Sequence, residues 1–459
     1  MTAKPNPWVD RFDCGVSDDK ISERIRIEAI PILELSRAPL ELAVRLLQKG
    51  LDKVFVPTPQ ICQAIRMLLG VARAHALVRY PNLLTFVQGL YQQDRSSVEM
   101  PFPSWPPICL TGLAGVGKTE LQQAFIRWLM ADSFVEVPGH VQVPLVSVWR
   151  MSVTAGTTLS HLLHPLLFGG ASQTQIQYGT LMPAARHGAF RQGVCMISAD
   201  EFQFLSQSLA ANAAVSKLLM QLSALGPPLL FVANLSLLHR LVKRPQEERQ
   251  RLLTTVCVLE PESQESNEHA ACLREKFRVA PEFRALDALT DGRNIYRYTF
   301  GIKRLETQLL VIAYRASREE GSQVVTGKHL DTAYRSMDYA TARTDVELLI
   351  QQAETGRPAR EGLRERLDLS CPITVRKMSN VFEHPATREH DRRVALASLV
   401  AGMSRASQDA YRQIEQKQEP TAPAAERVAK AARPKPTLET LLAGAKEFSQ
   451  AQEHKKKRT

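Results

Sequence analysis

The sequence predicts an α/β fold, in which a five-stranded parallel sheet is wrapped by helices, preceded by a helical extension and followed by a helical lid. Two observations predict it. Between residues 106 and 260, short apolar runs alternate with helical stretches, which is typical of a parallel sheet covered by helices. The glycine-rich stretch Gly112–Thr119 lies directly after the first apolar run and opens a helical stretch, so the first strand–turn–helix unit is well marked.

Residues 1–101 form the predicted helical extension. We expect no regular structure in the first residues, up to about residue 20, because apolar periodicity is missing there. Apolar residues at helical spacing follow Pro57-Thr58-Pro59, so a helix is predicted with Thr58 as its N-cap. A second helix is predicted over residues 81–92.

Residues 102–260 form the predicted sheet domain. Each of its strands is a short apolar run bounded by polar or turn-forming residues, and the gaps between them are filled by helices, the first starting at Lys118. The five predicted strands are Ile108–Thr111, Pro144–Trp149, Gly193–Ser198, Leu229–Ala233 and Thr255–Leu259.

Residues 261–355 form the predicted helical lid, because the strand pattern ends at Glu260. A helix is expected around the apolar stripe from Leu305 to Ala316, and another over Gly327–Met337. Residues 356–459 are expected to end in a flexible basic tail, since the composition shifts to Gln, Glu, Pro, Ala and Lys and the chain finishes with Lys455–Arg458. One apolar cluster in this tail, Leu438 to Leu442, is a candidate amphipathic turn for a partner.

Composition narrows the class of protein. Lys and Arg number 58 against 47 Asp and Glu, and the resulting net charge of +11 favours contact with polyanions. The seven cysteines are scattered singly, which argues against a disulfide framework or a zinc knuckle and fits a reducing cytoplasm. No apolar signal core opens the chain, and the uncharged run Leu218–Leu238 is split by Gly226-Pro227-Pro228 into segments too short to cross a membrane.

The stretch Gly112–Thr119 matches the pattern G-x-x-x-x-G-K-[ST]. Its glycines let successive backbone N–H groups point at phosphate oxygens, Lys118 is placed to reach the β- and γ-phosphates, and the Thr119 hydroxyl to bind Mg²⁺. We therefore expect ATP and Mg²⁺ as cofactors; the alternative is an ordinary glycine-rich turn with an exposed lysine. The predicted nucleotide-binding residues are Gly112, Leu113, Ala114, Gly115, Val116, Gly117, Lys118, Thr119 and Glu120.

Two carboxylates follow the third predicted strand. Asp200 is the expected second Mg²⁺ ligand, acting through the water shell of the ion, and Glu201 the expected general base for hydrolysis. The alternative is an aspartate that only caps a helix. Asn234 follows the fourth strand, where it can orient the attacking water, although an asparagine is also common at such a turn.

Three arginines, Arg244, Arg249 and Arg251, precede the fifth strand. An arginine there can reach across a subunit boundary to the γ-phosphate of a neighbour, and we assign this catalytic role to Arg249 or Arg251. The alternative for each is a solvated helix face. His161 and His164 are spaced to share a metal, but no third ligand lies near them in sequence.

In its order of motifs, from phosphate loop through acidic pair, strand-end asparagine and arginine to helical lid, the chain resembles the AAA+ ATPases. In detail it resembles the TnsC/TniB type, the ATP-dependent regulators of DNA transposition. The stretch Asp200–Leu205 is similar to the family pattern D-E-[IV]-Q-x-L, with Phe202 in place of the aliphatic residue. Further similarities are Val148-Trp149, Thr299–Ile302, Thr326 and Ala333-Tyr334, and the resemblance covers roughly residues 106–352.

This resemblance implies an ATP-bound homo-oligomer, a ring or filament, that binds double-stranded DNA and is dissolved by hydrolysis. It also implies a transposase and a target-selector protein as partners, DNA-facing residues at Arg150, Thr154, Thr157 and Arg186–Arg191, and a nucleotide-sensing lid residue that is either Lys303 or Arg304. Two alternatives stay open: a signalling or defence scaffold of the STAND type, and a DNA-bound adaptor that binds ATP without turning it over.

Overall fold

A computed structural model describes residues 6–91, 105–129, 134–137, 139, 142–153, 157–168, 178–200, 209–355, 360–361, 364–365 and 368–369 of the chain. All of them lie in the first of two compact units, Met1–Asn380; the second is Val381–Thr459. The expected flexible tail, its apolar cluster Leu438–Leu442 and its terminal Lys455–Arg458 lie outside the described residues. The division into four parts at residues 101, 260 and 355 stays a prediction.

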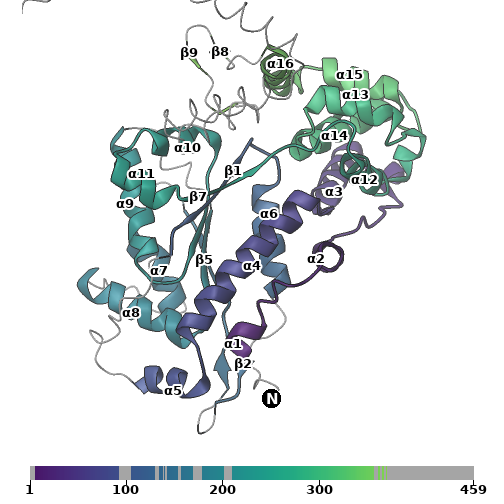
Figure 1. The fold of residues 1–459 in the computed structure, drawn as a ribbon. Helices are drawn as coiled ribbons and strands as arrows, with labels where there is room; N and C mark the ends of the chain where they lie inside the picture. Colours follow the sequence, from purple (N-terminus) through teal and green to yellow (C-terminus); the bar gives the residue numbers. More distant parts are fainter. Residues whose placement is uncertain are drawn as a thin grey trace, which may run out of the picture. The chain divides into compact units, whose positions relative to one another are not determined.

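A five-stranded parallel sheet organises the first unit, in the order β4-β5-β6-β1-β7 (Figure 1). Strand β1 lies between β6 and β7 and is buried along its whole length. The strands are β1 Ile108–Gly112, β4 Val148–Ser152, β5 Met196–Asp200, β6 Leu229–Val232 and β7 Thr255–Leu259. Because all five run in the same direction, Gly112, Asp200 and the residues after Val232 lie at one edge of the sheet. The expected α/β fold, a parallel five-stranded sheet wrapped by helices and followed by a helical lid, is confirmed.

Two of the predicted strands are displaced. The predicted strand Pro144–Trp149 was wrong at its start, since Val143–Pro144 (β3) pairs antiparallel with Phe134–Val135 (β2) in a separate ribbon. The predicted strand Gly193–Ser198 begins too early and ends too early, because β5 continues to Asp200, which pairs with Ser152. Ser198 is buried within β5, and its polar hydroxyl is satisfied there because it accepts a hydrogen bond from the buried Gln122 side chain at 2.6 Å.

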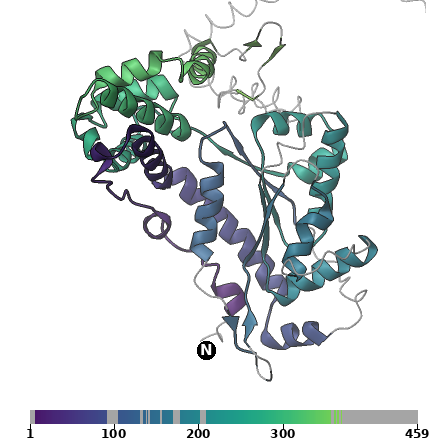
Figure 2. The same ribbon diagram turned by 180° about the vertical axis from the view of Figure 1, so that it is seen from behind.

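Helices cover both faces of the sheet (Figures 1 and 2). Helices α4 and α6 lie on one face, and α9, α10 and α11 on the other. Their bounds, with those of the remaining helices of this part, are α4 Pro59–Arg79, α6 Lys118–Leu129, α7 Leu159–Phe168, α8 Tyr178–Arg191, α9 Leu209–Ser223, α10 Leu235–Val242 and α11 Gln246–Leu252. Helix α9 and strand β6 divide the uncharged run Leu218–Leu238 as expected.

The N-terminal extension is more ordered than the sequence predicted. Helix α1, Pro7–Asp10, and the start of α2, Asp18–Ile25, lie in the stretch that was expected to lack regular structure, and Asn6 and Ser17 cap the two helices. These helices are short, so side-chain caps and packing rather than periodicity define them. Trp8, for example, stacks on Tyr80 with ring centroids 6.0 Å apart.

Helices α4 and α5 (Leu83–Tyr91) confirm the two predicted helices of the extension, and the Thr58 side chain caps α4 by accepting from Ile61 N at 3.5 Å. By length and composition alone, α4 is the one described helix able to cross a membrane, with half of its apolar window buried inside the protein. Core helices of soluble proteins pass the same test, so this is weak evidence for a membrane span.

The helical lid has a hydrophobic core of its own. It comprises α12 Asn267–Phe277, α13 Thr290–Thr299, α14 Lys303–Glu319, α15 Gly327–Arg335 and α16 Ala340–Thr355, which confirms the two predicted lid helices. Beyond the expected end of the strand pattern, a short hairpin of β8 Arg360–Glu361 and β9 Arg364–Glu365 is present as well.

One helix of the N-terminal extension belongs to the lid. Helix α3, Leu40–Lys53, packs against α14, and Ala43, Leu47 and Leu51 share a core cluster with Leu309 and Tyr314 (Figure 1). Helices α1 and α4, in contrast, contribute to the core that contains the sheet. The extension is therefore divided between the two hydrophobic cores of the first unit, which its sequence did not predict.

Candidate functional site

The phosphate loop connects β1 to α6 through residues that require glycine. Gly112 has φ of 151°, and a Cβ at that position would lie 2.3 Å from the carbonyl oxygen of Leu259, the last residue of β7. Gly115 has φ of 81°, in the left-handed region that disfavours other residues. The loop therefore turns tightly at the carboxyl edge of the sheet, immediately before the N-terminus of α6, as the sequence predicted.

Lys118 is folded back onto this loop. Its ammonium group donates to the carbonyl oxygens of Gly112 at 3.0 Å and Leu113 at 2.8 Å. Burial lowers the pKa of the ammonium to about 8; the Asp200 carboxylate opposes this shift, and Arg304 adds to it. The side chain is thus a partly desolvated cation that would gain from an anionic partner.

Thr119 and Asp200 meet at the same edge. The Thr119 hydroxyl donates to the Asp200 carboxylate at 3.0 Å, so the first turn of α6 and the end of β5 bring two oxygen ligands together. This pair fits Mg²⁺, which prefers oxygen and is commonly held by one or two protein groups plus phosphates. Glu201, the predicted general base, lies outside the described residues.

No group of three or more His, Cys, Asp or Glu side chains gathers as a metal site within the described ranges. The predicted Mg²⁺ position does not conflict with this, since a hydroxyl and one carboxylate form it. His164 packs against Phe168 with ring centroids 4.9 Å apart. The pair His161 and His164 therefore gains no support as a metal site from the described residues.

Asn234 acts first as a helix cap. Its side-chain oxygen accepts from Leu237 N and from the Ser236 hydroxyl, both at 2.9 Å, at the start of α10. The turn-forming alternative considered for this residue is therefore present. Its role in orienting water stays a prediction, for which the amide nitrogen is the available group.

The three arginines of the α10–α11 segment differ in their contacts. Arg244 forms a two-pronged ion pair with Glu248 at 2.8 and 2.9 Å. Arg249 donates to the Val242 carbonyl at 3.5 Å. Arg251 is exposed on α11, and no hydrogen bond or ion pair joins it to another residue in the described part of the chain. Of the two predicted trans-acting arginines, Arg251 is therefore the more exposed.

The first residues of α14 lie against the phosphate loop. The backbone N–H of Arg304 donates to the Gly115 carbonyl at 3.2 Å, and a Cβ at Gly115 would lie 2.7 Å from Cβ of Arg304. Lys303 lies by the second half of the loop, where its Cδ would be 3.8 Å from a Cβ at Gly117. The sequence left open which of these two residues senses nucleotide; the geometry brings both to the loop.

The predicted DNA-facing residues do not form one cluster. Arg150 is exposed in the middle of β4, and Thr157 precedes α7, whereas Thr154 lies outside the described residues. Arg186 donates to the Ala224 carbonyl at 3.0 Å. Arg191 ends α8 at the amino edge of the sheet, away from the phosphate loop.

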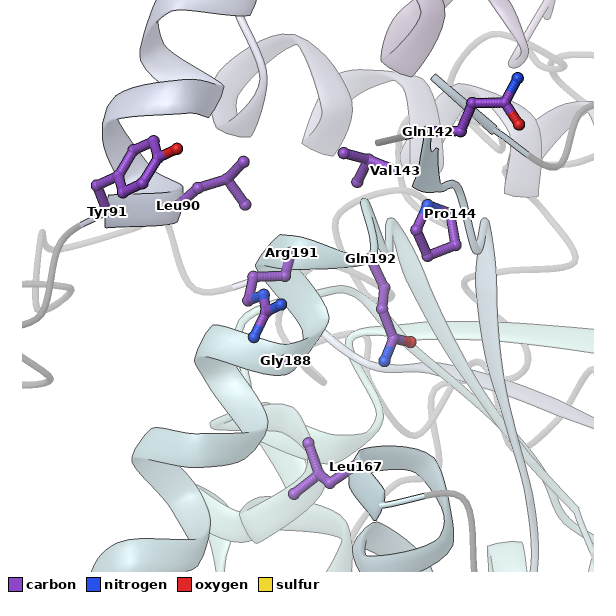
Figure 3. A pocket seen from close by; sticks show the side chains of 9 residues that line it. All are labelled: Leu90, Tyr91, Gln142, Val143, Pro144, Leu167, Gly188, Arg191 and Gln192. Carbon is purple, nitrogen blue, oxygen red and sulfur yellow. The ribbon is translucent and has the colours of Figure 1, made fainter. Parts of the chain in front are cut away.

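A separate hollow of about 620 Å³ lies at that amino edge (Figure 3). Its walls come from α5, α7, the end of α8 and β3, and Gln192 within it is fixed by the Trp149 indole N–H at 2.8 Å. Because the phosphate loop follows the carboxyl end of β1, this hollow belongs to the opposite edge of the sheet. It is not part of the predicted nucleotide site.

No protein-family model and no curated protein matches the chain. Among solved structures, it is similar to Cdc6p from Pyrobaculum aerophilum (12% identity over 56% of this chain and 68% of that chain, TM-score 0.38). It is also similar to the ORC1 protein of Aeropyrum pernix in complex with DNA (16% identity over 66% of this chain and 81% of that chain, TM-score 0.36). A third similar structure is Drosophila ORC bound to DNA (15% identity over 80% of this chain and 86% of that chain, TM-score 0.38). Since each TM-score is below 0.5, the assignments that follow rest on this chain's own residues.

Gly115→Ala should displace the lid from the phosphate loop and abolish ATP binding, because the new Cβ would overlap Arg304. Gly321→Ala is the matched control: Gly321 also has a positive φ, 73°, but nothing lies within 4 Å of its Cβ position. Both changes should cost on the order of 1 kcal/mol of stability through backbone strain. Fluorescent-nucleotide titration and thermal melting check this; equal ATP affinity in the two variants would contradict the contact.

ATP binding should take up protons above pH 8. Between about pH 8 and the ordinary lysine pKa of 10.5, Lys118 is largely neutral in the nucleotide-free protein, and a bound triphosphate would favour its charged form. Affinity should therefore fall as pH rises through this window. Calorimetry at pH 8.5 in two buffers of different ionisation enthalpy should give on the order of half a proton or more per site. No proton uptake would show that Lys118 does not meet the phosphates.

Proposed function

We propose that this chain is an ATP-dependent regulator of DNA transposition of the TnsC/TniB type, which binds target DNA as an ATP-bound oligomer and recruits the transposase. The proposal starts from a nucleotide site. The observation that carries it is the convergence of Lys118, the Thr119–Asp200 pair and the start of α14 on one phosphate loop. A cation, two Mg²⁺-type ligands and a lid at one loop are what binding of a nucleoside triphosphate requires.

The residues of the site have separate roles in hydrolysis. Lys118 would exchange its two carbonyl partners for phosphate oxygens, which are stronger acceptors because they are charged. Thr119 and Asp200 would hold Mg²⁺, which supplies charge neutralisation at the phosphates when bound. Glu201, next to Asp200 in the sequence, would take the proton of the attacking water, which Asn234 would orient.

Assembly on DNA is supported by charge and by exposure. Arg251 is exposed on α11, a surface position from which a side chain could contact the nucleotide of a second copy. The net charge of +11 favours a polyanion such as the DNA backbone. We propose that ATP bridges copies into a ring or filament on double-stranded DNA, and that hydrolysis in the cytoplasm releases them.

The link to transposition is supported by the sequence stretch Asp200–Leu205, in which Gln203 stands two places after Glu201. A target-selector protein and transposase subunits are the proposed further partners. The two remaining alternatives, a STAND-type scaffold and an adaptor without ATP turnover, differ from this proposal in whether DNA and hydrolysis are coupled. One experiment separates all three.

Glu201→Gln should bind ATP, stall hydrolysis and accumulate oligomers on duplex DNA that outlast those of the parent, because the water is no longer deprotonated. Lys118→Ala is the control and should form no ATP-dependent DNA complex. DNA affinity should also drop steeply with salt, on the order of tenfold or more between 50 and 200 mM, as phosphate contacts require. Electron microscopy, ATPase assays and DNA-binding titrations measure these effects.

Three outcomes would reject parts of this account. Turnover of ATP by Glu201→Gln at the parent rate would remove the assigned base. Closed wheels that form with ATP but without DNA would favour the scaffold. DNA binding that requires ATP but is never followed by hydrolysis in the parent would favour the adaptor.

A further inference from the structure

A buried ion cluster lies inside the lid, behind the residues that touch the phosphate loop. Glu306 of α14 pairs with the Lys276 ammonium at 2.8 Å and with His269 Nδ1 at 3.3 Å, and all three side chains are at most 4% exposed. Burial alone would raise the pKa of Glu306, but Lys276 and His269 hold it below its ordinary value. The ion pair of Lys276 and Glu306, with the His269 imidazole beside it, is therefore buried inside the lid.

Such a buried cluster contributes little net free energy to the stability of a fold. Moving charges out of water costs free energy that their attraction only partly returns, and apolar residues of the same size often replace a buried ion pair without loss. Its position therefore calls for a role beyond stability. Lys276 indicates what that role is, because its ammonium group also makes a hydrogen bond to a residue outside the cluster.

The Lys276 ammonium also donates to the backbone carbonyl of Lys303 at 2.9 Å. Lys303 is the first residue of α14, and the next residue, Arg304, donates its N–H to the Gly115 carbonyl. A continuous set of contacts thus runs from the cluster in α12 and α14, through one peptide unit, to the phosphate loop.

The turn that precedes α14 is unusual as well. Phe300 ends α13 with a left-handed φ of 54°, which is uncommon for a bulky side chain. Gly301 follows with φ of 67°, and a Cβ there would lie 3.1 Å from the Glu262 carbonyl oxygen. Backbone held in this conformation needs support from its surroundings, and the Lys276 bond to Lys303 lies two residues further on.

We propose that the buried cluster His269–Glu306–Lys276 is a positioning device that holds Lys303 and Arg304 on the phosphate loop and so sets the preference of the site for ATP over ADP. This inference rests on the proposed nucleotide site. Two cations held over the loop attract ATP, which carries a third phosphate and more negative charge, more strongly than they attract ADP. If they are released, ATP loses more affinity than ADP does.

The test replaces Lys276 and Glu306 together, so neither of these two charges is left without the other, and His269 keeps its Nε2 contact with the Gly292 carbonyl at 3.4 Å. The double variant Lys276→Met/Glu306→Leu keeps apolar volume, so its melting temperature should stay within about 5 °C of the parent. Its dissociation constant for MgATP should rise about tenfold and that for MgADP less than about threefold. Lys276→Arg keeps a cation that can donate to both Glu306 and the Lys303 carbonyl, and should retain the parent ATP-to-ADP ratio.

Tyr339→Phe is the matched control. Tyr339 is fully buried in the lid, and its hydroxyl donates to the Tyr298 carbonyl at 2.9 Å rather than to the backbone of Lys303 or Arg304. Removing that bond should weaken the lid without altering the ATP-to-ADP ratio. Should the double variant lack a cooperative thermal transition, Lys276→Met/Glu306→Gln, which also removes both charges and keeps a polar group beside His269, takes its place with the same expected change.

The outcomes are distinct. An unchanged ratio in the double variant, or an equal change in Tyr339→Phe, would overturn the positioning role. If the parent itself bound neither nucleotide, the proposed function would fail before this inference was reached. A selective loss of ATP affinity in the double variant, with the parent ratio in Lys276→Arg and Tyr339→Phe, would support the positioning role.

Discussion

The contact between the Gly115 carbonyl and the Arg304 N–H joins the two halves of the site. One partner is a loop that glycine alone can form, and the other is the start of a helix whose core lies elsewhere. Because the contact is made by backbone groups, it depends on the placement of whole elements rather than on one side chain. Lys303 and Arg304 lie at the phosphate loop only while the lid keeps this place.

The N-terminal extension strengthens this constraint. The chain passes from α2 to α3 near Arg26, which pairs with Glu275 of the lid at 3.1 Å, and returns through Phe55 to α4. Two cations lie over the Phe55 ring: the guanidinium carbon of Arg127, from α6, is 5.1 Å from the ring centroid, and the ammonium nitrogen of Lys303, from the lid, is 6.0 Å from it. Together with the segment after β7, the lid therefore has three chain connections to the sheet-bearing part. Any movement of the lid during a nucleotide cycle must also move α3.

The sequence predicted those parts of the fold and site that local chemistry determines. The phosphate loop was found because Gly112, Lys118 and Thr119 stand at fixed spacing, and the central strands β1 and β6 because they are short, uncharged and mostly apolar runs. Strand β4 was misplaced because its residues alternate between buried and exposed, so Arg150 and Ser152 hide its true end. The sequence did not predict that helix α3 packs on the lid, because an amphipathic pattern indicates which face of a helix is buried but not which element it packs against.

The buried cluster His269–Glu306–Lys276 was not predicted from the sequence. Lys276 and Glu306 are 30 residues apart, and each alone is an ordinary charged residue in a helical stretch. Only packing makes them partners, and no local pattern marks it. The arginine assignment was limited in the same way, since the ion pair of Arg244 with Glu248 and the exposure of Arg251 follow from how α11 sits on the surface.

The central claim is that one triphosphate binds where the phosphate loop and the lid meet. Calorimetric titration of the folded wild-type chain with ATP and magnesium tests it most directly. The account predicts saturable binding of one ATP per chain, stronger with magnesium than without it. A titration that shows no binding of adenine nucleotides by the folded protein would contradict the account.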